Sequence, residues 1–243
     1  MDRPRILTTS RAEAAQLAGQ QLREVVPSRR DFAQYVDTQK QGLAAIVRLG
    51  TTAAWPTAQL VARARACDDA DVAALAVVTG AGGRPLTDLA AVADSTTAPI
   101  LRDDLIVDTR QLYSSRLHGA DAAIFPAADL DTEMLHELVS VASSLHIASI
   151  VEALSSADLA TALRLPRTVI GLRCLGPDGR LDCKRTLELA RAVPPQRTVI
   201  CLAEVDAATE CAHLRGSCDA VMVGEGLATS DDVAAALREL LAQ

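Results

Sequence analysis

Short apolar runs rich in β-branched residues alternate along the chain with longer segments in which alanine and leucine recur at helical spacing. Eight runs are predicted to be strands: 43–49, 72–78, 100–105, 122–125, 147–151, 168–172, 198–202 and 220–223. Polar turn residues follow each run. Amphipathic helices are expected after them, for example over 131–145, 156–163, 183–192 and 231–241.

The strand ends are evenly spaced, about 25 residues apart, which is the length of one strand, loop and helix. Continuous apolar strands favour a parallel sheet that is covered on both faces. Eight such units in sequence predict a single (β/α)₈ TIM barrel over residues 41–243, preceded by an N-terminal helical extension over residues 1–40. A doubly wound open sheet is the alternative. No Gly-, Ser- or Pro-rich linker divides the chain, so one domain over 1–243 is expected.

Three short motifs predict helix starts. Ser10 and Glu13 have the spacing of a capping box, and the helix that they would begin is expected to run to Pro27. Segments 155–158 and 229–232 supply two further starts of the same kind.

Composition narrows the class of protein. The 243 residues are 49% hydrophobic and 23% charged, and this high apolar content excludes a disordered chain. The net charge of −7 argues against nucleic-acid or anionic-membrane partners. The chain lacks a long apolar run, and its start lacks the apolar stretch of a signal peptide. A cytoplasmic protein is therefore expected.

The cysteines and histidines do not form a metal-binding pattern. The six cysteines contain no C-x-x-C pair, and no histidine lies beside them at zinc-like spacing. We therefore expect no metal and no cofactor, and interpret the thiols as buried and reduced. Cys174 follows Arg173 at a strand end, so a nucleophilic role for it is a separate hypothesis, although no strand-end histidine is there to activate it.

Five or more ionisable residues are found among the positions where the apolar strands end. The positions are Arg48, Thr79, Asp103, Asp104, Glu152, Arg173, Cys174, Glu204 and Gly224. In a barrel these ends meet at one mouth, which is where such folds place their functional groups. The residues either form a site there or serve only as salt bridges between neighbouring strands.

At these strand ends the chain resembles indole-3-glycerol phosphate synthase, from about residue 30 to the C-terminus. The segments that carry the resemblance are 98–108 (APILRDDLIVD) with Gln111 and Tyr113, then 119–122, 150–152, 170–171, 203–204 and 219–225. In that family a carboxyphenylamino-deoxyribulose 5-phosphate closes to an indole ring with loss of CO₂ and water. Such chemistry needs a general acid, a cation for the substrate carboxylate and a carboxylate that assists dehydration.

The resemblance implies which positions carry this chemistry, and several are substituted. Only Glu152 and Glu204 are retained. Arg48 stands where the family has a strand-one lysine, and Ile46 replaces its glutamate. The strand-three lysine, the expected general acid, is Asp103, and the strand-six asparagine is Arg173.

The implied phosphate-binding loops are altered as well. The strand-one loop reads Leu49, Gly50, Thr51 and Thr52, and Asp206 lies where the strand-seven loop of the family has glycine. Gly224, followed by Glu225, is retained after strand eight. Thr51, Thr52, Gly224 and Glu225 are the weak candidates for phosphate binding, because a carboxylate facing the donors of a phosphate site is unfavourable.

We expect the ring-closing decarboxylation, a carboxy-lyase reaction, to be absent or strongly impaired. One alternative is a remodelled site that binds or converts a different small anionic metabolite between Arg48 and Arg173. Another is a pseudoenzyme that acts as a structural or regulatory partner of another protein, for which an exposed apolar patch on the helical ring would be the sign.

Overall fold

Eight parallel strands close into a barrel in which every strand pairs with its neighbours in chain order and β8 pairs with β1. This computed structural model describes residues 3–18, 25–38, 42–51, 55–81 and 83–241. The strands are β1 (Ala44–Leu49), β2 (Ala74–Val78), β3 (Ile100–Leu105), β4 (Ala122–Pro126), β5 (Ala148–Ala153), β6 (Val169–Leu172), β7 (Val199–Val205) and β8 (Ala220–Val223). The predicted (β/α)₈ barrel is confirmed.

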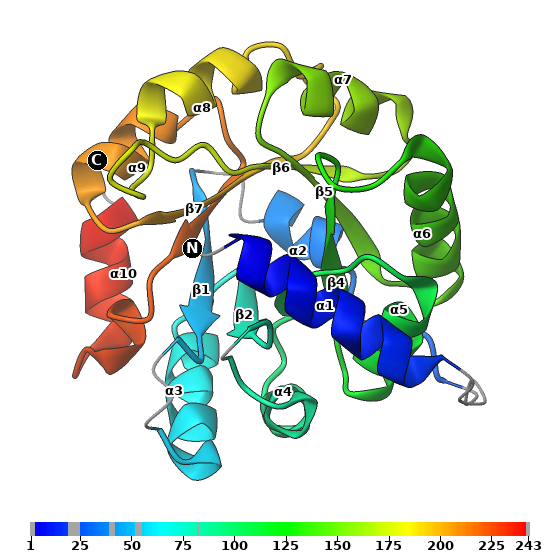
Figure 1. Cartoon of the computed structure of the whole chain (residues 1–243). Helices are drawn as coiled ribbons and strands as arrows, with labels where there is room; N and C mark the ends of the chain where they lie inside the picture. Colours follow the sequence, from blue (N-terminus) through cyan, green and yellow to red (C-terminus); the bar gives the residue numbers. More distant parts are fainter. Residues whose placement is uncertain (1–2, 19–24, 39–41, 52–54, 82, 242–243) are drawn as a thin grey trace.

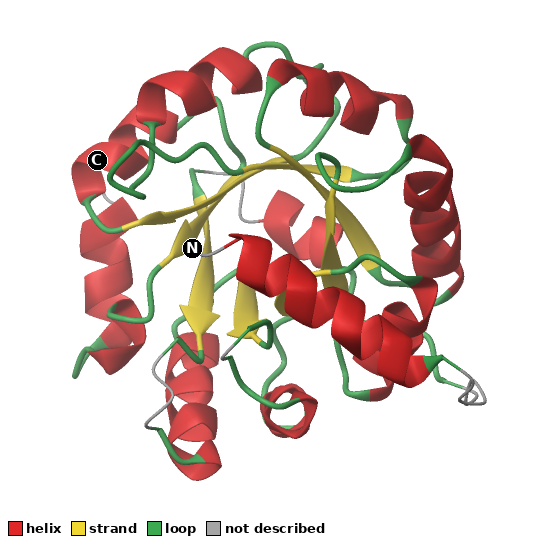
Figure 2. Ribbon diagram, viewed as in Figure 1, coloured by secondary structure: helices red, strands yellow, loops and turns green. Residues whose placement is uncertain are grey.

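A ring of helices surrounds the strands (Figures 1 and 2). They are α3 (Thr57–Asp69), α4 (Leu86–Ala93), α5 (Thr109–Leu117), α6 (Thr132–Ser144), α7 (Ser156–Arg164), α8 (Cys183–Ala190), α9 (Ala208–Leu214) and α10 (Val233–Leu241), with the 3₁₀ turn η1 (Leu227–Thr229) before α10. The predicted start of α7 is confirmed, because the Ser155 side chain accepts a hydrogen bond from the Asp158 amide. Among the described helices, none has the length and apolar character to cross a membrane.

Side chains along each strand alternate between the barrel interior and the surrounding helices. Ile46, Ile150 and Ile200 fill the interior, whereas their neighbours Val47 and Val151 pack in the layer beneath the helices. The side chain two residues after each interior position points into the barrel again. The alternation therefore decides which strand-end residues face the centre of the mouth.

The N-terminal extension contributes two helices, one at each end of the barrel. Helix α2 (Phe32–Thr38) closes the amino end, where Phe32 and Val36 are buried among interior side chains. Helix α1 (Arg3–Leu17), dark blue in Figure 1, crosses in front of the barrel and contacts β3 and α5. The barrel is thus covered by its own extension at both openings.

The helix start predicted at Ser10 is wrong. Helix α1 begins at Arg3, and Ser10 lies in its middle, buried, with its hydroxyl donating to Asp104 Oδ1 at 3.0 Å. Glu13 accepts a hydrogen bond from Arg102 at 2.6 Å. Both supposed capping residues therefore serve a tertiary contact. The expected continuation towards Pro27 falls partly on residues 19–24, outside the described residues.

Replacing Phe32 by alanine tests the closure of the amino end. Phe32→Ala should lower the free energy of unfolding by about 3–5 kcal/mol, because the ring is only 1% exposed and its loss leaves a cavity. Tyr35→Ala on the same helix is the control and should cost about 1 kcal/mol or less, since Tyr35 is 37% exposed. Urea unfolding measures both; equal losses would contradict the packing of α2.

Candidate functional site at the carboxyl end of the barrel

Arg48 on β1 joins two acidic side chains across the mouth. Its Nε donates to Asp103 Oδ2 at 2.6 Å, and its Nη1 donates to Glu204 Oε2 at 3.3 Å. Arg48 and Asp103 lie two residues beyond the interior positions Ile46 and Leu101, so strand alternation turns both inward. Strands β1, β3 and β7 are thereby linked through one guanidinium group.

Arg173, just after β6, forms a second set of contacts on the other side of the mouth. Its Nε donates to Glu152 Oε1 at 2.6 Å, and its Nη1 donates to the Leu202 carbonyl at 2.8 Å. Its Nη2 lies 3.9 Å from Asp103 Oδ1. Neither of these last two atoms has a hydrogen-bond partner within the described part of the chain. Asp103 therefore lies between two arginines but bonds directly to one.

The two arginines keep Asp103 ionised. Burial alone would raise its pKa, but the charges of Arg48 and Arg173 outweigh burial and hold the pKa below its usual range. In return, the charge of Asp103 raises the pKa of Arg48. At neutral pH Asp103 is thus an acceptor of hydrogen bonds and carries no proton to donate.

The neighbours of Asp103 on β3 face the opposite side of the strand. Arg102 Nη2 donates to Asp104 Oδ2 at 2.8 Å and to Glu13 of α1 at 2.6 Å. Burial raises the pKa of Asp104 despite its contact with Arg102. Thr79, predicted at the mouth, accepts a hydrogen bond from Arg102 Nε and belongs to this outer cluster.

Helix α1 also reaches into the mouth through Arg3. Its Nη1 donates to Glu152 Oε2 and its Nη2 to Asp129 Oδ2, both at 2.5 Å. Burial alone would lower the pKa of Arg3, but the two carboxylates raise it. Because Arg173 holds the other oxygen, both carboxylate oxygens of Glu152 are bonded to arginine.

The residues predicted to bind phosphate bond to one another. The Glu225 carboxylate accepts hydrogen bonds from the Gly50 amide at 2.6 Å and from Thr51 Oγ1 at 2.5 Å. A Cβ atom on Gly224 would meet the carboxylate of Glu204, whose flexible side chain would have to move aside. Thr52 lies outside the described residues. A carboxylate of the chain itself thus occupies the donors of the β1 loop.

A cavity of about 260 Å³ lies beside this network. Its lining includes Arg5 of α1, Arg48, Thr51, Gly80 and Asp103. Elsewhere, among the residues that the structure describes, no group of His, Cys, Asp or Glu side chains is arranged to hold a metal ion.

Structure and sequence agree on the centre of the mouth but not on its rim. Five predicted residues come together there, namely Arg48, Asp103, Glu152, Arg173 and Glu204. Sequence reasoning missed Arg3 and Asp129. Asp129 follows β4, and a search for polar residues after every strand would have found it. Nothing in the local pattern indicates where Arg3 docks.

Cys174 and the lysines lie outside the network. Cys174 is buried, and burial raises the pKa of its thiol, which opposes a nucleophilic role. Lys184 is exposed on α8, and Lys40 lies outside the described residues. The positive charges described at the mouth therefore come from arginine, and Lys184 does not reach it.

A family model and several curated proteins match this chain. A model of the family described as indole-3-glycerol phosphate synthase matches residues 3–240. The synthase of Dehalococcoides mccartyi (strain 195) is 37% identical over 145 residues, covering 59% of this chain and 56% of that protein. The synthase of Legionella pneumophila (strain Lens) is 29% identical over 155 residues, covering 63% and 60%. The matched stretch thus spans a little over half the length of these curated relatives.

Solved structures support the fold alone. The crystal structure of 3-hexulose-6-phosphate synthase from Salmonella typhimurium superposes with a TM-score of 0.65 at 14% identity, covering 82% of this chain and 96% of that one. A second 3-hexulose-6-phosphate synthase structure gives the same TM-score at 17% identity. At these identities a shared barrel implies no shared reaction.

Acid unfolding of an Asp103 variant tests the central ion pairs. A carboxylate whose folded pKa is lowered stabilises the protein above the unfolded pKa of about 3.9, and this contribution is lost as pH falls through the folded pKa. Asp103→Asn should therefore cost about 3–5 kcal/mol at pH 7. In urea unfolding, the difference in free energy of unfolding between variant and wild type should shrink as the pH falls below the unfolded pKa.

Asp104→Asn is the control for this experiment because the stability difference between it and the wild type should change with pH in the opposite direction. The folded pKa of Asp104 is raised, so its contribution is present below the unfolded pKa and is lost as pH rises through the folded pKa. The wild type should lose stability relative to Asp104→Asn as pH rises. The same slope in both variants would refute the assignment of the two carboxylates.

Replacing Arg3 tests whether α1 is fastened to the mouth. In Arg3→Ala, amide hydrogen exchange over residues 3–17 should become faster by about a factor of ten or more, since a charge-assisted hydrogen bond contributes about 1.5–3 kcal/mol. Arg11→Ala, exposed on the same helix, is the matched control and should leave exchange unchanged. Equal protection in Arg3→Ala and wild type would show that the ion pairs do not hold the helix.

Proposed function

The chain belongs to the indole-3-glycerol phosphate synthase family, and from this premise we propose a non-catalytic family barrel in which internal ion pairs have taken the place of the catalytic groups. The ring-closing decarboxylation expected from the family is then lost or strongly impaired. One observation carries the proposal: at the position where the resemblance places the general acid, Asp103 is a buried carboxylate held ionised by Arg48 and Arg173.

The loss of a proton source supports this conclusion first. An ionised Asp103 has no proton for a carbonyl oxygen at neutral pH, and the guanidinium of Arg48 stays charged and is a poor proton donor. Removing one positioned acid or electrostatic donor commonly costs a factor of about 10² to 10⁴ in rate. Losses within one catalytic set are not additive, so the total is not the product of such factors.

The ion pairs of the two retained glutamates also support the proposed loss of activity. Glu152 is bonded through both oxygens to Arg173 and Arg3, and Glu204 is paired with Arg48. A carboxylate that assists dehydration must be free to accept and release a proton. The contacts with arginine occupy both oxygens of Glu152 and one oxygen of Glu204, where that proton would be exchanged.

The electrostatics of the loops oppose a phosphate group. Glu225 already accepts the hydrogen bonds of the Gly50 amide and the Thr51 hydroxyl. Asp206 and Glu239 line the neighbouring pocket after β7 and β8, and none of the described residues that line it is a lysine or an arginine. A phosphate entering this region would therefore meet carboxylates, which repel it.

Binding of a different small anion at the mouth is the second candidate. The cavity of about 260 Å³ beside Arg48 and Arg5 favours it. An entering anion would, however, compete with Asp103 for Arg48 across a contact of 2.6 Å. A role as a partner of another protein receives less support: Val26, Tyr35 and Leu117 are the large apolar side chains exposed among the described residues, and single exposed side chains are ordinary. We place the protein in the cytoplasm, as its composition predicts.

A steady-state assay tests the proposed loss of activity. The purified chain, supplied with the carboxyphenylamino-deoxyribulose 5-phosphate of the family, should form indole-3-glycerol phosphate at a rate lower by a factor of about 10² or more than a working family member. The Dehalococcoides mccartyi synthase, assayed in parallel, is the positive control. A cooperative thermal transition shows that the chain is folded. Turnover at an ordinary enzymatic rate, or rescue of a tryptophan auxotroph lacking its own synthase, would overturn the proposal.

A further inference from the structure

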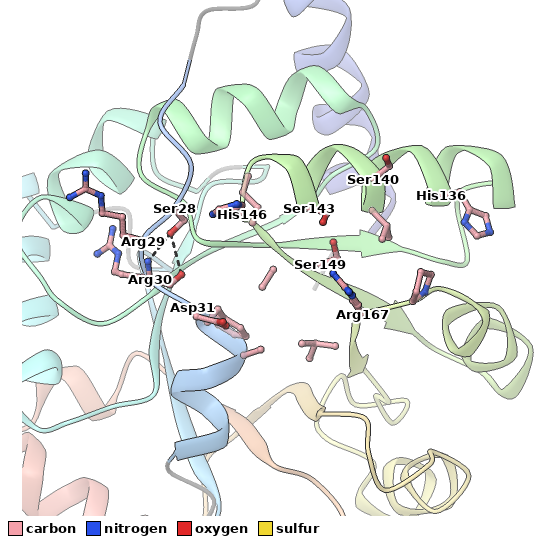
Figure 3. A pocket seen from close by; sticks show the side chains of 17 residues that line it. Ser28, Arg29, Arg30, Asp31, His136, Ser140, Ser143, His146, Ser149 and Arg167 are labelled. Atoms are coloured by element: carbon pink, nitrogen blue, oxygen red, sulfur yellow. Dashed lines mark hydrogen bonds between the residues drawn. The ribbon is translucent and has the colours of Figure 1, made fainter.

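A larger cleft lies at the other end of the barrel, away from the charged mouth. It has a volume of about 740 Å³ and lies among α2, the carboxyl half of α6 and the first residues of β5 and β6 (Figure 3). This volume is typical of sites that enclose a small organic molecule. The family resemblance places no reaction at this end, where conserved features of barrels ordinarily serve stability.

The cleft has an apolar floor. It is lined by four buried apolar residues: Phe32 from α2, Val139 from α6, Ile147 just before β5 and Val169 from β6. Pro166 adds an apolar side on the loop before β6. Such a surface suits an aliphatic or aromatic group, which loses its contact with water when it binds there.

Hydrogen-bond donors gather at one end of this floor. Ser143, Ser149 and Arg167 point toward one another in Figure 3, and Ser140 lies on the same helix as Ser143. Ser149 is only 5% exposed, yet within the described part of the chain its hydroxyl has no hydrogen-bond partner. The protein does not fully enclose this oxygen, so the hydroxyl is available to donate to a molecule bound in the cleft.

Two lining residues adopt a backbone conformation that favours glycine. His146 and Arg167 both have φ of 54°. Glycine would adopt this left-handed conformation without the steric cost of a Cβ atom. Both positions nevertheless carry side chains with nitrogen donors, and both line the same cleft.

The charge of the cleft is not balanced internally. Arg30 pairs with Asp121 at 2.8 Å, and Asp31 accepts a hydrogen bond from the Gln34 amide at the start of α2. Arg29 and Arg167, by contrast, make no ion pair within the described part of the chain. With Asp31 as the one acidic side chain in the lining, the cleft carries a surplus of positive charge.

We propose that this cleft binds a phosphate monoester whose ester group is apolar. The guanidinium of Arg167 and the hydroxyls of Ser140, Ser143 and Ser149 supply donors for the terminal phosphate oxygens, and the apolar floor receives the ester group. A tetrahedral phosphate matches several convergent donors better than a planar carboxylate does. The site lies apart from the mouth, so it stands or falls independently of the proposed loss of catalysis.

Calorimetric titration with phenyl phosphate tests the proposal. One molecule should bind per chain, with an affinity about tenfold or more above that of either inorganic phosphate, which lacks the apolar group, or phenol, which lacks the charge. Arg167→Gln should weaken the binding of phenyl phosphate by about tenfold or more. The matched control is Arg164→Gln, an exposed arginine at the end of α7 that does not line the cleft, and it should bind as the wild type does.

Two further variants separate binding from folding. Arg167→Gly relieves the left-handed conformation, so its unfolding midpoint should equal or exceed that of the wild type while phenyl phosphate binding is lost. Ser149→Ala should weaken binding with the unfolding transition retained. Absence of saturable binding to the wild type, or equal affinity in Arg167→Gln and Arg164→Gln, would overturn the proposal.

Discussion

Three consecutive ionisable residues in the buried strand β3 impose the constraint on which the rest of the structure depends. Arg102, Asp103 and Asp104 are each no more than 3% exposed, and an unpaired charge at such depth is strongly destabilising. Strand alternation sends Asp103 to the mouth and its two neighbours to the outer face. Arg48 and Arg173 lie beside the carboxylate of Asp103. On the outer face, Asp104 accepts a hydrogen bond from Ser10 of α1, and Arg102 donates one to Glu13 of the same helix. One strand thereby couples the barrel centre to the N-terminal helix.

Periodicity predicts this architecture well because the barrel repeats one local unit. Strand positions, their even spacing and the inward charges Arg48, Asp103 and Glu152 all follow from patterns within about 25 residues. The predictions fail where the role of a residue depends on a contact that is distant in the sequence. Ser10 has the spacing of a helix cap, but its partner is Asp104, 94 residues away. Arg3 reaches Glu152 across 149 residues, a pairing that no local pattern encodes.

Most charged groups at the mouth pair with one another, although Asp103 Oδ1 and Arg173 Nη2 have no hydrogen-bond partner within the described residues. Catalytic groups are held by their neighbours but keep a reacting atom free for substrate, at a cost in stability. Here three arginines, Arg3, Arg48 and Arg173, face the carboxylates of Asp103, Asp129, Glu152 and Glu204. Internal pairing recurs at the β1 loop, where the Glu225 carboxylate accepts hydrogen bonds from the Gly50 amide and the Thr51 hydroxyl.

This difference also decides where an anion would bind most readily. At Arg48 an entering anion must compete with Asp103, and the exchange of one anion for another yields little net energy. In the cleft at the amino end, Arg167 makes no ion pair within the described residues and the Ser149 hydroxyl has no partner there, so a ligand adds contacts without breaking any. The ligand site proposed at the amino end therefore requires no exchange of partners among the charged groups of the mouth. The physical distinction between the two ends is the presence of an internal counter-ion, rather than the number of charged residues.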